Sequence, residues 1–134
     1  MKKVAISGYF DPIHVGHLDY IELSKKLGDY LIVIINNNNQ CNLKKGKPFM
    51  DEKDRMKIVS SIQWVDEVYL SIDQDKTVCK SLETLKPDIF TNGGDRHNKE
   101  IPEAVVCRKY GIELLDGMGK KIRSSSDLTG LTSI

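Results

Sequence analysis

The sequence predicts an α/β fold with three layers, in which helices cover both faces of a five-stranded parallel sheet. Short apolar runs rich in β-branched residues alternate with segments of helical periodicity along the 134 residues. Five such runs separated by helical patterns imply parallel strands joined by right-handed crossovers. The alternation contains no internal repeat. With 40% hydrophobic residues, a chain of this length can bury one core, so we expect a single domain over residues 1–134.

The first part of the chain reads as a βαβ unit. Residues 3–7 are expected as a buried strand, residues 17–27 as a helix with an apolar face, and residues 30–36 as a strand rich in Ile and Val. The segment 36–48, rich in Asn, Lys and Gly, is expected as a connection, and its asparagine run 36–39 should end the strand.

The rest of the chain continues the alternation, with turn and capping residues at the expected boundaries. The expected elements are a helix capped by Asp51, a strand over 67–72, a helix capped by Asp75 and running to Leu85, a strand over 88–91, a helix from Pro102 to about Tyr110, a strand over 112–115 and a last helix beginning at 124–126.

A run with two histidines, residues 8–17, follows the first strand and leads into the first helix. If Gly16 and His17 open that helix, His14 lies just outside its first turn, where unpaired N–H groups and the positive end of the helix dipole attract anions. Gly8 permits a tight turn after the strand, and Gly16 leaves room for a ligand to approach the backbone. The pair is therefore placed to bind a phosphoryl group.

Asp11, within the same run, is expected to orient a metal ion or a lysine. Two other interpretations of the histidines are a pair of surface side chains and two ligands of a zinc site. A zinc site needs further Cys or His ligands, but the third histidine, His97, is far along the chain and the cysteines are scattered. These facts favour the phosphate interpretation.

Two loops are expected to form the ligand site together. In open parallel sheets, ligands bind beyond the carboxyl ends of the strands, where the strand order reverses. The loops after the first and fourth strands, residues 8–15 and 92–98, should meet there. Neither a Gly-x-Gly-x-x-Gly turn nor a Gly-Lys-Ser/Thr loop follows the first strand, which argues against a dinucleotide fingerprint or a P-loop.

Charge and cysteine content indicate a cytoplasmic protein without nucleic-acid or membrane partners. The net charge is +1 and the isoelectric point is about 7.7, so any attraction for phosphate must be local. Three widely spaced cysteines are typical of reduced thiols. The first residues contain no long apolar stretch of the kind found in secretory signals.

The pattern Gly-x-Phe-Asp-x-x-His-x-Gly-His over residues 8–17 resembles the signature of a nucleotidyltransferase superfamily with a Rossmann-like fold. Further segments match the cytidylyltransferase-like branch in order and spacing, and almost the whole chain is covered. These segments are residues 27–33, the pair Asp54-Arg55, residues 64–68, Gly93-Gly94-Asp95 and Ser124-Ser125-Ser126.

The resemblance implies a set of site residues. The residues expected to act in catalysis are His14, His17, Lys45 and Arg55. Those expected to bind the nucleotide are Gly8, Tyr9, Phe10, Asp11, His14, Gly16, His17, Gly93, Gly94, Asp95, Arg123, Ser124, Ser125 and Ser126. The acceptor is expected to contact Lys45, Asp11 and Arg55, although Lys44 and Lys47 compete with Lys45 for the phosphate-binding lysine.

The resemblance also implies the reaction. A nucleoside monophosphate would pass from a triphosphate, CTP in the leading interpretation, to a phosphorylated alcohol such as glycerol 3-phosphate, releasing pyrophosphate. Relatives imply a homodimer and Mg²⁺ without direct protein ligands. One alternative is an ATP-dependent heptose-phosphate adenylyltransferase, because the Gly-Gly-Asp-Arg of residues 93–96 is closer to those enzymes than to the glycerol-phosphate enzymes. Tyr9 also departs from the threonine that is usual at this position. A second alternative, from another class, is a non-catalytic nucleotide-binding domain.

Overall fold

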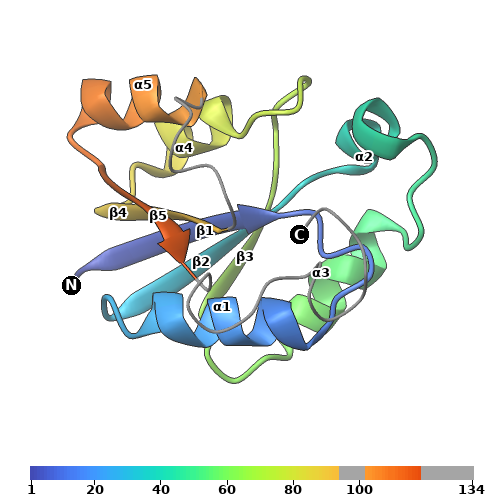
Figure 1. Ribbon diagram of the computed structural model, residues 1–134, viewed down its shortest axis with the longest axis horizontal. Helices are drawn as coiled ribbons and strands as arrows, with labels where there is room; N and C mark the ends of the chain where they lie inside the picture. The colour runs from blue at the N-terminus through green and yellow to red at the C-terminus, as the bar shows by residue number, and fades with distance from the viewer. Residues whose placement is uncertain (94–101, 119–134) are drawn as a thin grey trace.

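Five parallel strands form one sheet in the order β3-β2-β1-β4-β5 (Figure 1). The structure is a computed structural model that describes residues 1–93 and 102–118. The strands are β1 (Lys3–Gly8), β2 (Tyr30–Ile35), β3 (Glu67–Leu70), β4 (Ile89–Gly93) and β5 (Glu113–Met118). The predicted α/β fold with a five-stranded parallel sheet is confirmed.

The helices divide between the two faces of the sheet (Figure 1). They are α1 (Val15–Lys25), α2 (Asn38–Lys45), α3 (Glu52–Ser60), α4 (Cys79–Leu85) and α5 (Pro102–Tyr110). Helices α1 and α3 cover one face and α4 and α5 the other, whereas α2 lies beyond the carboxyl ends of the strands. In the two described ranges, no helix combines the length and apolar character needed to cross a membrane.

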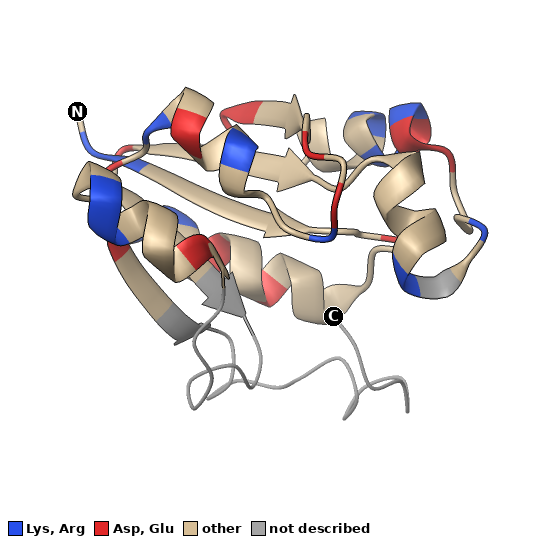
Figure 2. Cartoon of the chain, turned by 90° about the horizontal axis from the view of Figure 1, so that it is seen from above, with Lys and Arg blue, Asp and Glu red and all other residues tan. Residues whose placement is uncertain are grey.

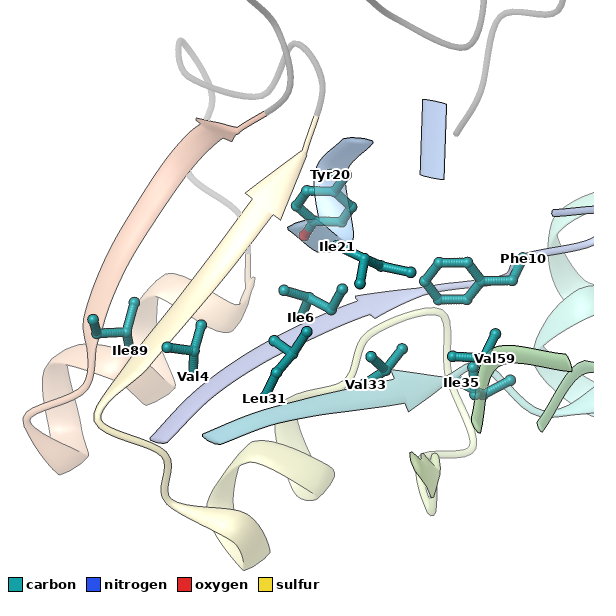
Figure 3. Packing of buried hydrophobic residues seen from close by; sticks show 10 residues of the cluster. All are labelled: Val4, Ile6, Phe10, Tyr20, Ile21, Leu31, Val33, Ile35, Val59 and Ile89. Atoms are coloured by element: carbon teal, nitrogen blue, oxygen red, sulfur yellow. The ribbon is translucent and has the colours of Figure 1, made fainter. Parts of the chain in front are cut away.

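The two-residue period of the strands builds a core on each face. On the face of α1 and α3, buried Val4 and Ile6 of β1 pack with Ile21 and Val59 (Figure 3). On the opposite face, Ala5 packs in a second cluster. Its other buried members are Ile32, Ile34, Val78, Leu82, Phe90, Val106, Cys107 and Ile112. Burial on both faces explains why these strands read as apolar runs.

The centre of the sheet is the point where the strand order reverses. Strand β1 pairs with β2 on one side and with β4 on the other, with Ile6 opposite Thr91. Helix α1 crosses β4, where the Tyr20 hydroxyl donates to the Thr91 carbonyl over 2.8 Å. The carboxyl ends of β1 and β4 therefore lie side by side, as the sequence predicts.

The expectation of a plain connection over 36–48 is wrong in one respect, because this segment contains α2. The Asn37 side chain accepts from the Gln40 N–H while the Gln40 side chain accepts from the Asn37 N–H, which is a capping box. Gly46, with a φ of 92°, ends the helix. Capping thus forms a helix in a segment whose composition is typical of a loop.

Asp75 does not cap α4, contrary to expectation. That helix begins later, at Cys79, and the carboxylate of Asp73 accepts from the N–H groups of Lys80 and Ser81 in its first turn. Asp75 instead holds a preceding turn by accepting from the N–H and hydroxyl of Thr77. By contrast, Asp51 caps α3 through the Lys53 N–H, as expected.

Basic and acidic residues are interspersed along the described helices and loops (Figure 2). This distribution agrees with a net charge of +1 and leaves any anion site to local geometry.

Candidate active site

The loop that follows β1 starts with a close contact that requires glycine. A Cβ at Gly8 would come within 2.9 Å of the Phe10 ring, so a side chain at this position would displace that ring. Phe10 itself is 1% exposed and has a φ of 51°. Figure 3 shows its ring in the core layer with Ile21 and Ile35. The core therefore fixes the direction in which the loop leaves the sheet.

The two histidines cap helix α1 reciprocally. His14 is the N-cap residue, and its Nδ1 accepts from the Gly16 N–H over 3.2 Å. The Nδ1 of His17 in turn accepts from the His14 N–H over 3.1 Å. The rings stack with their centroids 4.0 Å apart, and Phe10 lies against His17 at 4.9 Å. As expected, His14 stands just outside the first turn of the helix.

This capping fixes the tautomer of both rings. A backbone N–H can only donate, so each Nδ1 is unprotonated and each neutral ring carries its hydrogen on Nε2. His17 is 2% exposed, and its Nε2 has no hydrogen-bond partner among the described residues. The site thus holds a buried N–H donor at a helix N-terminus, where anions are attracted.

Both imidazoles are neutral at physiological pH. Burial lowers the pKa of His14, and burial together with the neighbouring His14 lowers the pKa of His17 from 6.5 to about 3. A neutral pair can donate two Nε2–H bonds without the mutual repulsion of two imidazolium rings. Such preorganised donors stabilise charge that develops on phosphoryl oxygens.

Arg55 is held by the loops around the site, and its expected contact with a substrate phosphate stays a prediction. Its side chain is 0% exposed and lies under the motif loop. The guanidinium donates to the carbonyls of Met50, Tyr9 and Asn36 and to Oδ1 of Asn38, over 2.6–3.0 Å. Arg55 therefore joins the ends of β1 and β2 to α2 and α3.

Asp11 holds the segment before α3, and its expected role in orienting a metal ion or a lysine stays a prediction. Its carboxylate accepts from the backbone N–H groups of Phe49 and Met50 over 2.7 and 2.6 Å. The side chain of Phe49 is 77% exposed beside this loop. Phe49 is not among the residues expected in the site, although an aromatic residue in a Lys-, Gly- and Pro-rich segment is a detectable signal.

At the end of α2, the side chain of Lys44 contacts the motif loop at Tyr9. Its Nζ lies 4.4 Å from the centroid of the Tyr9 ring. Lys45 is the last residue of α2, and the placement of its side chain is outside what the structure describes. The contribution of Lys45 therefore stays a prediction.

Part of the expected nucleotide site falls outside the described residues. Gly93 is the last residue of β4 and pairs with Met118 of β5. The positions that lie beyond the described ranges are Gly94, Asp95, Arg123, Ser124, Ser125 and Ser126. Within residues 1–93 and 102–118, no three His, Cys, Asp or Glu side chains form a group that could hold a metal ion.

Comparisons with known proteins agree with this geometry. The model of the cytidylyltransferase-like family matches residues 5–126. An FAD synthase from Ferroglobus placidus is 42% identical over 114 residues, which are 84% of this chain and 72% of that protein. Another FAD synthase, from Picrophilus torridus, is 35% identical and covers 94% of this chain and 92% of that protein.

A further relative and a solved structure, with other names, are also similar to most of this chain. The bifunctional protein HldE of Helicobacter pylori is 40% identical over 102 residues, which are 75% of this chain but 22% of that protein. A solved structure of a lipopolysaccharide core biosynthesis protein from Thermoplasma volcanium superposes with a TM-score of 0.73 at 29% identity, covering 87% of this chain and 95% of that one. Given the family match over most of its length, the chain belongs to the cytidylyltransferase-like family of nucleotidyltransferases.

Proposed function

We propose that this protein transfers the AMP group of ATP to a phosphorylated acceptor, with FMN as the first candidate, and releases pyrophosphate. The observation that carries the proposal is the stacked pair of neutral histidines at the N-terminus of α1, with the Nε2–H of His17 buried and unpartnered among the described residues. Such donors suit the oxygens of an α-phosphate under attack.

The reaction is a single displacement at phosphorus. A phosphate oxygen of the acceptor attacks the α-phosphorus of ATP, and the bond from that phosphorus to the oxygen bridging to the β-phosphate breaks. The acceptor monoester has a second pKa near about 6 and is largely dianionic at neutral pH, so it needs no strong general base. His14 and His17 would donate to the phosphoryl oxygens as charge accumulates there. No covalent intermediate with the protein is required.

Mg²⁺ is expected to enter with the triphosphate, because this ion binds mainly substrate phosphates and water. When bound, it neutralises charge on the leaving pyrophosphate. The chain's own part is to position both substrates and supply N–H donors. A homodimer, which the family resemblance implies, belongs to the same proposal and can be checked by light scattering.

The relatives favour ATP over the CTP and glycerol 3-phosphate of the leading sequence interpretation. FAD is FMN joined to AMP, so a synthase that makes it from ATP performs adenylyl transfer. The two FAD synthases match most of this chain and most of their own length. The exposed ring of Phe49, held beside the motif loop through Asp11, offers a surface on which a flat flavin can stack.

A heptose phosphate is the second candidate acceptor. The similarity to HldE favours it, since 75% of this chain matches that protein at 40% identity. Both candidates share adenylyl transfer from ATP and differ in the acceptor.

A screen of pyrophosphate release tests the proposal. ATP and CTP are each combined, with Mg²⁺, with FMN, a heptose phosphate and glycerol 3-phosphate. Release with ATP and FMN supports the proposal, and release with ATP and a heptose phosphate alone selects the second candidate. Release only with CTP and glycerol 3-phosphate would overturn the choice of ATP. Binding of ATP without release from any pair would instead indicate the non-catalytic alternative.

A further inference from the structure

Tyr9 and Lys44 join two segments that lie far apart in the sequence. Tyr9 belongs to the motif loop after β1, and Lys44 belongs to the last turn of α2. The Lys44 ammonium lies 4.4 Å from the centroid of the Tyr9 ring, well within the range of a cation–π contact. Lys44 is exposed and Tyr9 is half-buried, so the ring lies against a side chain at the surface of the protein.

The two ends of α2 are attached to different parts of the protein. At its start, the Asn37 amide donates to the Ser71 and Asp73 carbonyls, which belong to the segment after β3. At its end, the contact between Lys44 and Tyr9 reaches the motif loop. The contact therefore joins the last turn of α2 to the loop that carries the histidines.

We propose that Tyr9 is a positioning residue, which holds the ammonium of Lys44 beside the histidine pair so that it meets the triphosphate of the nucleotide. This inference rests on the proposed function. Tyr9 directly precedes Phe10, and the Phe10 ring lies 4.9 Å from that of His17. A lysine already held near the phosphate site loses less conformational freedom when the nucleotide binds, which favours binding. We therefore test Lys44, whose side chain contacts the motif loop.

A double-mutant cycle on ATP affinity tests the inference by calorimetry with the full chain. Y9L removes the ring but keeps the backbone carbonyl that Arg55 uses, and it should weaken ATP binding about 3- to 30-fold. Y9F keeps the ring and should retain most of the affinity. In a K44M background, Y9L should cause no further loss, because the two side chains act through one contact.

The chain offers a matched control in another cation–π contact. Lys86 lies 5.2 Å from the ring centroid of Tyr110, at the end of α5 and away from the motif. Y110L removes that contact and should leave the affinity for ATP unchanged. Thermal unfolding of Y9L, measured in parallel, separates a lost contact from a lost fold, and Y9F and K44M serve where Y9L does not fold.

The outcomes separate this inference from the proposed function. Equal losses in Y9F and Y9L, or losses of Y9L and K44M that multiply, would overturn the role of Tyr9 even if the wild type releases pyrophosphate. If Y9L and K44M show coupled losses of ATP affinity but the wild type releases no pyrophosphate with any acceptor, the role of Tyr9 is upheld and the proposed function is rejected. A wild type that binds no ATP would contradict both.

Discussion

The two histidines of the motif perform a structural task that other residues perform elsewhere in the same protein. In α1, His14 and His17 form a capping box, and in α2 the same box is made by Asn37 and Gln40. Capping therefore does not require imidazole. The feature that distinguishes the box of α1 is its two Nε2–H donors, which suit an anionic ligand.

This comparison within the chain suggests variants that separate capping from chemistry. H17Q can repeat the box of α2, so it should unfold within about 0.5 kcal/mol of the wild type, whereas H17A should lose about 1 kcal/mol. H17Q nevertheless lacks the imidazole, and its turnover should fall about a hundredfold or more with little change in nucleotide affinity. Urea unfolding and steady-state kinetics measure the two effects. Wild-type turnover in H17Q would mean that the pair serves capping alone.

The lowered pKa of His17 predicts acid sensitivity of the fold. Between about pH 6.5 and pH 3, the unfolded chain binds a proton at this position and the folded chain does not. The free energy of unfolding therefore falls as the pH is lowered, by up to about 1.4 kcal/mol per pH unit from this group. Urea unfolding at several pH values should give a shallower dependence for H17Q. Parallel curves for the wild type and H17Q would show that His17 titrates normally in the folded state.

At the scale of elements, the site depends on side chains that join segments of the chain. Arg55 of α3 binds the Tyr9 and Asn36 carbonyls, which lie just beyond β1 and β2, and Asn38 in the first turn of α2. Asp11 fixes the residues before α3 through two backbone N–H groups. The motif loop is thus held by Arg55 at Tyr9 and by the segment before α3 at Asp11, which preorganises the histidines.

Removal of Arg55 should destabilise the protein rather than merely weaken substrate binding. R55M leaves three carbonyls and one side-chain oxygen without their donor, and each buried acceptor left unpaired costs about 1–3 kcal/mol. We expect a loss of about 3 kcal/mol or more in urea unfolding. K57M, at an exposed position of the same helix α3, is the control and should change stability by less than about 0.5 kcal/mol. If R55M unfolds like the wild type but binds substrates weakly, Arg55 contacts phosphate instead.

The elements differ in how well the sequence predicts them. Strands buried on both faces are predicted well, because an apolar run such as that of β2 satisfies a local rule. Helix α2 is missed since its composition is polar, although the spacing of Asn37 and Gln40 is a readable capping signal. Asp73 and Arg55 bind segments that lie apart in the sequence. The local sequence pattern does not show which segments meet in space, so it cannot predict these contacts.

At the scale of the whole molecule, the topology brings the motif to the place where open α/β sheets bind ligands. Adjacent β1 and β4 end at the same edge, and the loop after β1 leads into the N-terminus of α1. The sequence predicts this arrangement because strand order and motif position depend on patterns of many residues. The nucleotide base and the acceptor depend on a few side chains, so a pattern shared by many residues does not determine the choice between ATP and CTP.

The most direct test of adenylyl transfer identifies the products of one reaction. The wild type is incubated with ATP, FMN and Mg²⁺, and the flavin and phosphate products are quantified by chromatography. Equal amounts of FAD and pyrophosphate are predicted, since the bond between the α- and β-phosphates breaks as AMP joins the phosphate of FMN. Formation of ADP with phosphate, or of AMP and pyrophosphate without a flavin product, would contradict transfer to this acceptor.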